Sequence, residues 1–223
     1  MIPTLIDKQD TFEIVRDQIA AILALEIANQ QTLAIAAAKD PKDWKLRIYT
    51  ERSNPWEQFL NIENETDRSP LVNVWFDNTS FDDKASNVME RQRSDAIFNI
   101  DCYGCGVSSN EITGGHNPGD KEAAFEVQKA VRLVRNILMA AEYTYLGLRG
   151  TVWKRMPQSV TVFQPQIEGR FVQHIVGARI AFSVSFSEFS PQVQPETLEY
   201  LSAIINRAED GEIVINADYD YTI

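Results

Sequence analysis

Two cysteines separated by two residues are the first candidates for chemistry. Cys102-Tyr103-Gly104-Cys105 has the C-x-x-C spacing of redox pairs and of zinc-binding loops. A redox pair needs its first thiol at the N-terminus of a helix, where the dipole favours the thiolate. This pair instead ends a predicted strand and precedes a long loop. The spacing therefore favours a structural role, with Cys102 in the core and Cys105 in a loop.

Histidine, glycine and acidic residues are weaker candidates. A zinc site would need two more ligands, and the two histidines, His116 and His174, lie far apart in the sequence. The loop at 114–119 precedes a helix, where anions can bind, but it lacks the Gly-Lys-Ser/Thr ending of a P-loop. No Ser or Cys nucleophile stands beside His116, and the acidic residues are scattered through loops. We therefore expect no catalytic residue, no cofactor and no metal, and we predict that the protein is not an enzyme.

Basic residues are concentrated in one segment. Between Lys121 and Arg155 the sequence has seven basic residues and three acidic ones, although the formal charge of the whole chain is −11. Three of the basic residues recur at three-residue spacing on the polar side of a predicted helix. An ordinary solvated helix face would explain this pattern. A more specific hypothesis is that this face contacts an acidic loop of the next subunit in a head-to-tail ring. The candidate subunit-interface residues are Lys129, Arg132, Arg135 and Arg149.

Composition limits the classes of protein to consider. The 223 residues, 44% hydrophobic and 24% charged, suit one large domain, or one domain with extensions, that buries a substantial core. The acidic balance argues against a general nucleic-acid coat, since phosphate binding depends on Lys and Arg. No basic segment followed by an apolar one opens the chain, and no uninterrupted apolar run is long enough for a bilayer, so we expect no signal peptide and no membrane partner. Two cysteines exclude a disulfide framework and indicate a reducing compartment.

Two long helices should position these residues. The first is predicted from Asp10-Thr11 to about Ala38, where Pro41 follows, and its apolar residues recur every three or four positions. Those residues are Phe12, Val15, Ile19, Ile22, Leu23 and Ile27. The second helix is predicted from the Asn117–Asp120 segment to about Tyr145, before Gly147. We expect both to pack on a sheet, and the first also has enough apolar surface to pack on a neighbouring subunit.

Alternating residues predict the strands of that sheet. The predicted strands are 44–50, 71–76, 95–103, 160–163 and 171–189, with a bend or bulge in the last at Gly177. In 95–103 the even positions are apolar and the odd positions are more polar, which is typical of a sheet covered by helices on one face. Polar loops are expected at 51–70, with a helical turn near 56–60, at 77–94 and at 104–119. A short helix from Pro195 to Gly211 and an edge strand at 212–215 should follow, before an acidic, aromatic tail.

These elements define the expected fold class and domains. We predict an α+β fold, with a mostly antiparallel sheet of about four to five strands. The long N-terminal helix and the second long helix pack on one face of it. Residues 1–191 should form this single domain, and residues 192–223 a C-terminal helix and strand extension.

Four segments carry a resemblance to a known family. They are Asn117-Pro118-Gly119-Asp120, the stretch Ala130 to Leu138, Tyr145-Leu146-Gly147-Leu148, and Pro157-Gln158-Ser159-Val160-Thr161. They resemble tail-module proteins of contractile-tailed bacteriophages, over about Ala96 to Pro191. The order helix, three strands, helix, two strands is similar to that of the tail terminator proteins. None of these motifs is a catalytic signature.

The resemblance implies a structural virion protein that acts in tail completion. Terminators form a hexameric ring that ends the tail tube and joins the tail to the neck and head, with DNA passing through the lumen. The implied partners are further copies of the chain, tube and sheath proteins, neck proteins, and genomic DNA without sequence-specific binding. The implied location is the tail or neck of the virion, after virus assembly in the host cytoplasm. An acidic subunit suits this role, because a negative lumen does not retain DNA.

Three alternatives stay open at this point. The long loops and the C-terminal extension depart from compact terminators, and they leave open another neck or head–tail connector protein, or a baseplate subunit. An enzyme centred on the cysteine pair or His116 would contain stoichiometric zinc or an acidic thiol. A DNA-binding adaptor would give a salt-sensitive gel shift.

Overall fold

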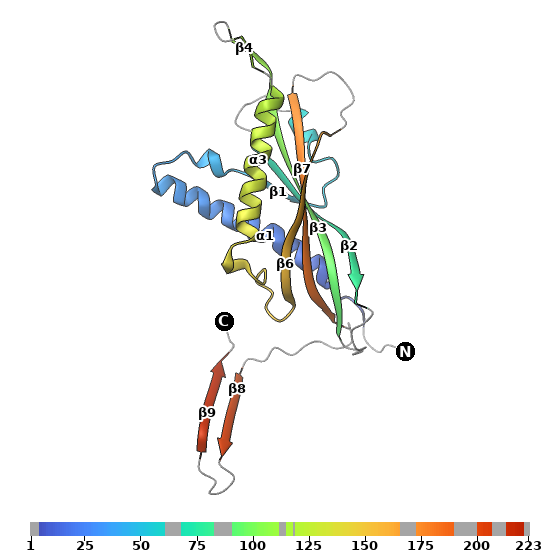
Figure 1. Ribbon diagram of the computed structural model, residues 1–223, viewed down its shortest axis with the longest axis vertical. Helices are drawn as coiled ribbons and strands as arrows, with labels where there is room; N and C mark the ends of the chain where they lie inside the picture. The colour runs from blue at the N-terminus through green and yellow to red at the C-terminus, as the bar shows by residue number, and fades with distance from the viewer. Residues whose placement is uncertain are drawn as a thin grey trace.

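The fold is α+β, as predicted, and is built on one five-stranded mixed sheet (Figure 1). The computed structural model describes residues 5–60, 68–82, 91–111, 115–117, 119–165, 173–189, 200–206 and 213–220. The sheet has the order β1-β2-β3-β7-β6. Its strands are β1 Arg47–Thr50, β2 Leu71–Phe81, β3 Arg91–Val107, β6 Val152–Phe163 and β7 Gln173–Phe189. Only β1 and β2 are parallel; the other neighbours are antiparallel.

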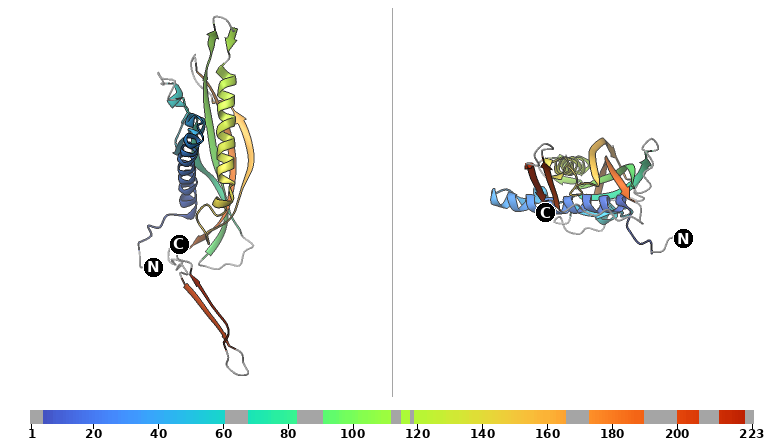
Figure 2. Two further views of the ribbon diagram at one scale, coloured as in Figure 1. Left: turned by 90° about the vertical axis from the view of Figure 1, so that its left-hand side faces the viewer. Right: turned by 90° about the horizontal axis from the view of Figure 1, so that it is seen from below.

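Two long helices, α1 (Thr11–Ala36) and α3 (Gly119–Leu138), accompany this sheet. Figure 1 shows α3 running along the long strands while α1 crosses them, and Figure 2 shows the two helices side by side. Shorter elements join or extend them. These are η1 Pro41–Trp44, α2 Glu57–Leu60, β4 Ser109–Glu111, β5 Gly115–Asn117, η3 Ala141–Tyr143, β8 Tyr200–Asn206 and β9 Ile213–Asp220. The strands β4 and β5 pair with each other, and so do β8 and β9.

Both long helices pack on the same face of the sheet. The even positions of β3, which are Ala96, Phe98, Ile100 and Cys102, are fully buried in one core cluster. The same cluster contains apolar residues of α1 from Val15 to Ile27 and of α3 from Ala130 to Leu138, together with the even positions of β7 from Ile180 to Phe186. Ala123 and Val127 of α3 pack with Val176 and Ala178 of β7 in a separate cluster on the same face. The predicted burial of this face is therefore confirmed, and hydrophobic burial between two helices and one sheet face forms the main core.

The opposite face of the sheet has a smaller cover. The short helix α2 brings Phe59 against Leu71, Tyr103, Cys105 and Ile175 in a second, separate apolar cluster. The predicted helical turn at 56–60 is thus confirmed, and the segment 61–67 lies outside the described residues. Beyond this cluster the face carries polar side chains, so it differs chemically from the face under the helices.

Two glycines in β3 allow α3 to approach the sheet closely. A Cβ at Gly104 would lie 2.5 Å from the Ala123 carbonyl oxygen and 2.9 Å from the Val127 nitrogen, both in the backbone of α3. A Cβ at Gly106 would meet the Gly119 carbonyl oxygen at the start of the same helix. Any side chain at either glycine would push the helix away, because a backbone cannot rotate aside as a side chain can.

Several predicted boundaries are wrong because pairing extends the strands. Residues 77–81 continue β2 and residues 91–94 begin β3, so the predicted loop at 77–94 is shorter; 83–90 lies outside the described residues. Residues 104–107, predicted as loop, continue β3. The connection expected before residue 160 is part of β6, which begins at Val152. No bulge is present at Gly177, where the register with β3 continues and the Phe163 ring covers the glycine.

The two helix ends and the C-terminal extension also differ from the prediction. Helix α3 ends at Leu138 rather than near Tyr145, and Arg155 of β6 donates to the carbonyl oxygens of Ala140 and Tyr143 that follow it. These bonds connect the turn after α3 to β6. The helix predicted between Pro195 and Gly211 is wrong where the chain is described, because 200–206 is strand β8. Its alternation and β-branched isoleucines suit a strand paired with β9.

Helix α1 is long and apolar enough to cross a membrane by length and composition alone, which differs from the expectation that no segment is. Five residues predicted for its apolar face (Val15, Ile19, Ile22, Leu23 and Ile27) are buried in the main core, and Phe12 packs against it. Packing in the main core therefore explains the apolar residues on that face of α1. Other apolar side chains of the helix, among them Leu25, Leu33 and Ile35, are exposed.

Replacement of Gly104 tests the close contact between α3 and β3. We predict that Gly104→Ala lowers the free energy of unfolding by about 1–3 kcal/mol, because the new methyl meets helix backbone. Gly177→Ala is the matched control in the neighbouring strand, since the three atoms nearest to its methyl all belong to the Phe163 side chain and not to backbone. Urea unfolding of both variants measures the difference. Equal losses for the two variants would contradict the proposed role of Gly104.

Candidate functional site

The two cysteines lie on opposite faces of β3. Cys102 belongs to the core under the helices, whereas Cys105 belongs to the cluster around Phe59. Both are free thiols. Burial, with a smaller contribution from the charge of Asp101, raises the pKa of Cys102, and burial raises the pKa of Cys105 to about 11. The pair therefore cannot act together, and both residues pack as small apolar side chains.

The histidines do not form a cluster with other metal-ligating residues in the described part of the chain, where no group of three or more His, Cys, Asp or Glu side chains is found. His174 Nε2 lies 2.9 Å from the Ser108 hydroxyl oxygen, which also accepts a hydrogen bond from the Gly119 backbone N–H at 3.2 Å. These contacts link the start of β7, through Ser108 after β3, to the start of α3. The side chain of His116 lies outside the described residues.

The four predicted interface residues have different surroundings. Lys129 is half-buried, and its Nζ lies 2.9 Å from Asp43 of η1 and 3.9 Å from Glu126. Its charge therefore forms ion pairs within the subunit. Arg132 and Arg135 are exposed on α3. Arg149 is exposed in the turn before β6, beside a surface hollow also lined by Tyr145 and Trp153. The helix thus presents two arginines to solvent, and Arg149 belongs to a neighbouring surface.

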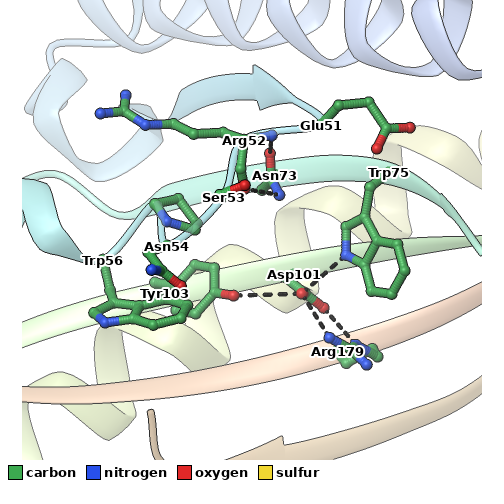
Figure 3. Close-up of a pocket in the computed structure, with 11 residues that line it drawn as sticks. Glu51, Arg52, Ser53, Asn54, Trp56, Asn73, Trp75, Asp101, Tyr103 and Arg179 are labelled. Carbon is green, nitrogen blue, oxygen red and sulfur yellow. Dashed lines mark hydrogen bonds and ion pairs between the residues drawn. The ribbon is translucent and has the colours of Figure 1, made fainter. Parts of the chain in front are cut away.

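Asp101 is the centre of a polar cluster that the sequence did not single out (Figure 3). Asp101 projects from the odd face of β3 and its side chain is only 4% exposed. It accepts hydrogen bonds from Arg179 Nε at 2.7 Å and Nη2 at 2.9 Å, from Trp75 Nε1 at 3.0 Å and from the Tyr103 hydroxyl at 3.3 Å. Four donors from three strands therefore satisfy one buried carboxylate.

Arg179 is held by aromatic rings as well as by Asp101. Its guanidinium lies 4.7 Å from the centre of the Trp75 ring and 5.7 Å from that of Phe163, distances typical of cation–π contacts. The hydrogen bond with Asp101 is the largest cause of the raised pKa of Arg179. Burial, followed by the charge of Asp101, raises the pKa of Tyr103. Both groups therefore keep their protons at neutral pH and stay hydrogen-bond donors to Asp101.

A shallow polar pocket of about 250 Å³ opens beside this network. The segment after β1 forms its rim, where Glu51 and Asn54 have positive φ angles of 49° and 47°. Asn73 fixes this rim, because its side chain accepts from the Arg52 backbone N–H and donates to the Arg52 carbonyl oxygen, both at 3.1 Å. Arginine, tryptophan and amide side chains line the pocket.

The sequence contained a weak signal for this network. Asn99, Asp101 and Tyr103 were placed on the more polar face of their strand, and Arg179 stands among the small polar residues of β7. No spacing rule joins Asp101 to Arg179, because 78 positions separate them and only the antiparallel register sets them opposite each other. The pairing could be found only with the topology known.

Replacement of Arg179 tests whether the network stabilises the fold. Arg179→Met should lower the free energy of unfolding by about 1–3 kcal/mol, because Asp101 stays buried without its cation. The loss should be smaller than for a fully buried pair, since the Arg179 side chain is 41% exposed. Arg93→Met on the same sheet face is the control, and it should change stability little. Chemical denaturation would contradict the account if both variants were as stable as the wild type.

Comparison of the sequence with models of protein families and with curated proteins found no match.

Proposed function

We propose that the chain is the subunit of a ring that terminates the tail tube of a contractile-tailed bacteriophage and joins the tail to the neck. The observation that supports this most directly is the order of the long elements. They run α1, three strands β1 to β3, α3, and two strands β6 and β7, with both helices on one sheet face. This is the order that the resemblance to tail terminators implies.

The segments that carry the resemblance have structural roles in the fold. Ala130, Val134 and Ile137 pack α3 into the main core. Leu146 is fully buried in the turn after the helix, where it and Gly147 have positive φ angles. The last resembling segment is part of β6, at the edge of the sheet. The resemblance therefore concerns the packing of α3 against the sheet and the exposed edge beside it.

Exposed apolar side chains agree with a subunit that assembles. Leu25, Leu33 and Ile35 are more than half exposed on α1, and Val160 and Val162 are exposed on β6. Contacts between subunits bury such side chains, and a basic α3 face can meet acidic loops of the next copy. A net charge of −11 on each subunit also suits a lumen through which DNA passes without being retained.

A different neck or connector protein is the second candidate, because such proteins also form rings. The β8–β9 hairpin favours a chain with contacts beyond a compact terminator. The two candidates differ in the position of the ring along the particle. Electron microscopy of particles carrying a label on this chain separates them: a terminator lies at the last tube ring, whereas a connector lies between it and the head.

Charge reversal on α3 tests the predicted subunit contact. Arg132→Glu with Arg135→Glu should weaken assembly by about tenfold or more, because attraction to acidic loops becomes repulsion. Lys42→Glu with Lys45→Glu makes the same change of charge at exposed positions near η1 and serves as the control. Multi-angle light scattering of the full chain gives the mass of each. An unchanged mass for the arginine variant would remove this face from the contact.

A further inference from the structure

Strand β6 ends the five-stranded sheet with an open edge. Among the described strands it pairs only with β7, although it is 12 residues long. Its backbone groups on the outer side are therefore available to another strand. Long open edges of this kind are sites where a strand from another chain can add to a sheet.

The side chains on the two faces of β6 differ in polarity, and this difference determines which kind of strand can be added. Val160 and Val162 pair with Ile180 and Ala178, so they lie on the face that the helices cover elsewhere, yet they are 50% and 65% exposed. Lys154 pairs with Ser185 and lies on the opposite face, where it is exposed. A strand that continues this sheet should therefore be apolar on the first face and acidic on the second.

The β8–β9 hairpin has this division in its register. One face carries the positions of Leu201, Ala203, Ile205, Ile215, Ala217 and Tyr219. The positions of Ser202, Asn216, Asp218 and Asp220 lie on the other face, with Tyr200 and Ile204. A two-stranded sheet is marginally stable by itself, and its apolar face needs a cover. The hairpin therefore matches the edge of β6 on both faces.

Charge over the two segments is also complementary. Residues 149–163 contain three basic residues and no acidic one, whereas residues 200–223 contain five acidic residues and one basic one. One of the three, Arg155, is bound to the carbonyl oxygens after α3, so Lys154 and Arg149 are the cations left to face a partner. Pairing of the two segments in either direction would bring opposite charges together, which favours their association.

We propose that the β8–β9 hairpin of a second copy adds to the open edge of β6, through β9. Figure 1 shows the hairpin apart from β6 of its own chain. Ten residues separate Phe189 from Tyr200, and an extended chain of that length spans at most about 33–36 Å. Donor and acceptor are different surfaces of one chain, so the contact is head-to-tail and can close a ring. The inference rests on the proposed ring and identifies its contact.

Complementation between two full-length variants tests this proposal. Lys154→Glu reverses the acceptor, and Asp218→Lys with Asp220→Lys reverses the donor. Each variant alone should associate about tenfold more weakly than the wild type, because like charges would then face each other. An equimolar mixture should regain assembly, since each reversed surface meets its reversed partner on the other variant. Sedimentation velocity gives the association, and native mass spectrometry shows whether both variants enter each assembly.

Two controls distinguish the possible failures. Lys45→Glu changes the same charge at an exposed site away from β6 and should assemble as the wild type does. Val162→Lys should weaken association without unfolding the chain, because the side chain is already exposed. The proposed strand addition is wrong if the wild type assembles and the charge variants assemble equally well, or if mixing the variants does not restore assembly. Either result leaves the proposed ring itself uncontradicted. A wild type that stays monomeric overturns both.

Discussion

Strand β3 lies between β2 and β7 and meets a different environment on each face. Its even positions form the floor of the core under α1 and α3, and its odd positions hold Asp101 within the hydrogen bonds of Arg179, Trp75 and Tyr103. A shift of one residue would put the carboxylate under the helices and the apolar side chains in the polar network. The two faces therefore fix the same register, and α3 can pack closely only where Gly104 and Gly106 stand in that register.

Periodicity in the sequence predicted the parts of the fold that depend on a single segment. The apolar face of α1, the even positions of β3 and those of β7 were all found in this way. Strand lengths were underestimated because polar residues such as Asn78 and Thr79 are held by pairing with β3. The predicted C-terminal helix was wrong because spacing of leucine and isoleucine fits both periods over seven residues, and the pairing with β9 decides between them. The Asp101–Arg179 pair depends on topology alone.

The sequence likewise predicted only part of what the structure shows about the candidate surface residues. Sequence spacing found the arginines that α3 exposes, but it could not show that Lys129 is used by Asp43 within the subunit. Sequence spacing also argued against a redox or zinc-binding role for the cysteine pair. The physical reason is that Cys102 and Cys105 lie on opposite faces of β3. The two helices cover one face of the sheet. The outer side of α1, the edge strand β6 and the pocket beside Arg179 stay at the surface. A subunit that binds further copies has its available surfaces there.

The central claim is that copies of this chain form a closed ring. Electron microscopy of the purified full-length protein, with the mass in solution measured on the same sample, tests it most directly. We expect a closed ring with a central opening and a mass of six copies. Particles of a single chain, or open filaments with no closed ring, would contradict it.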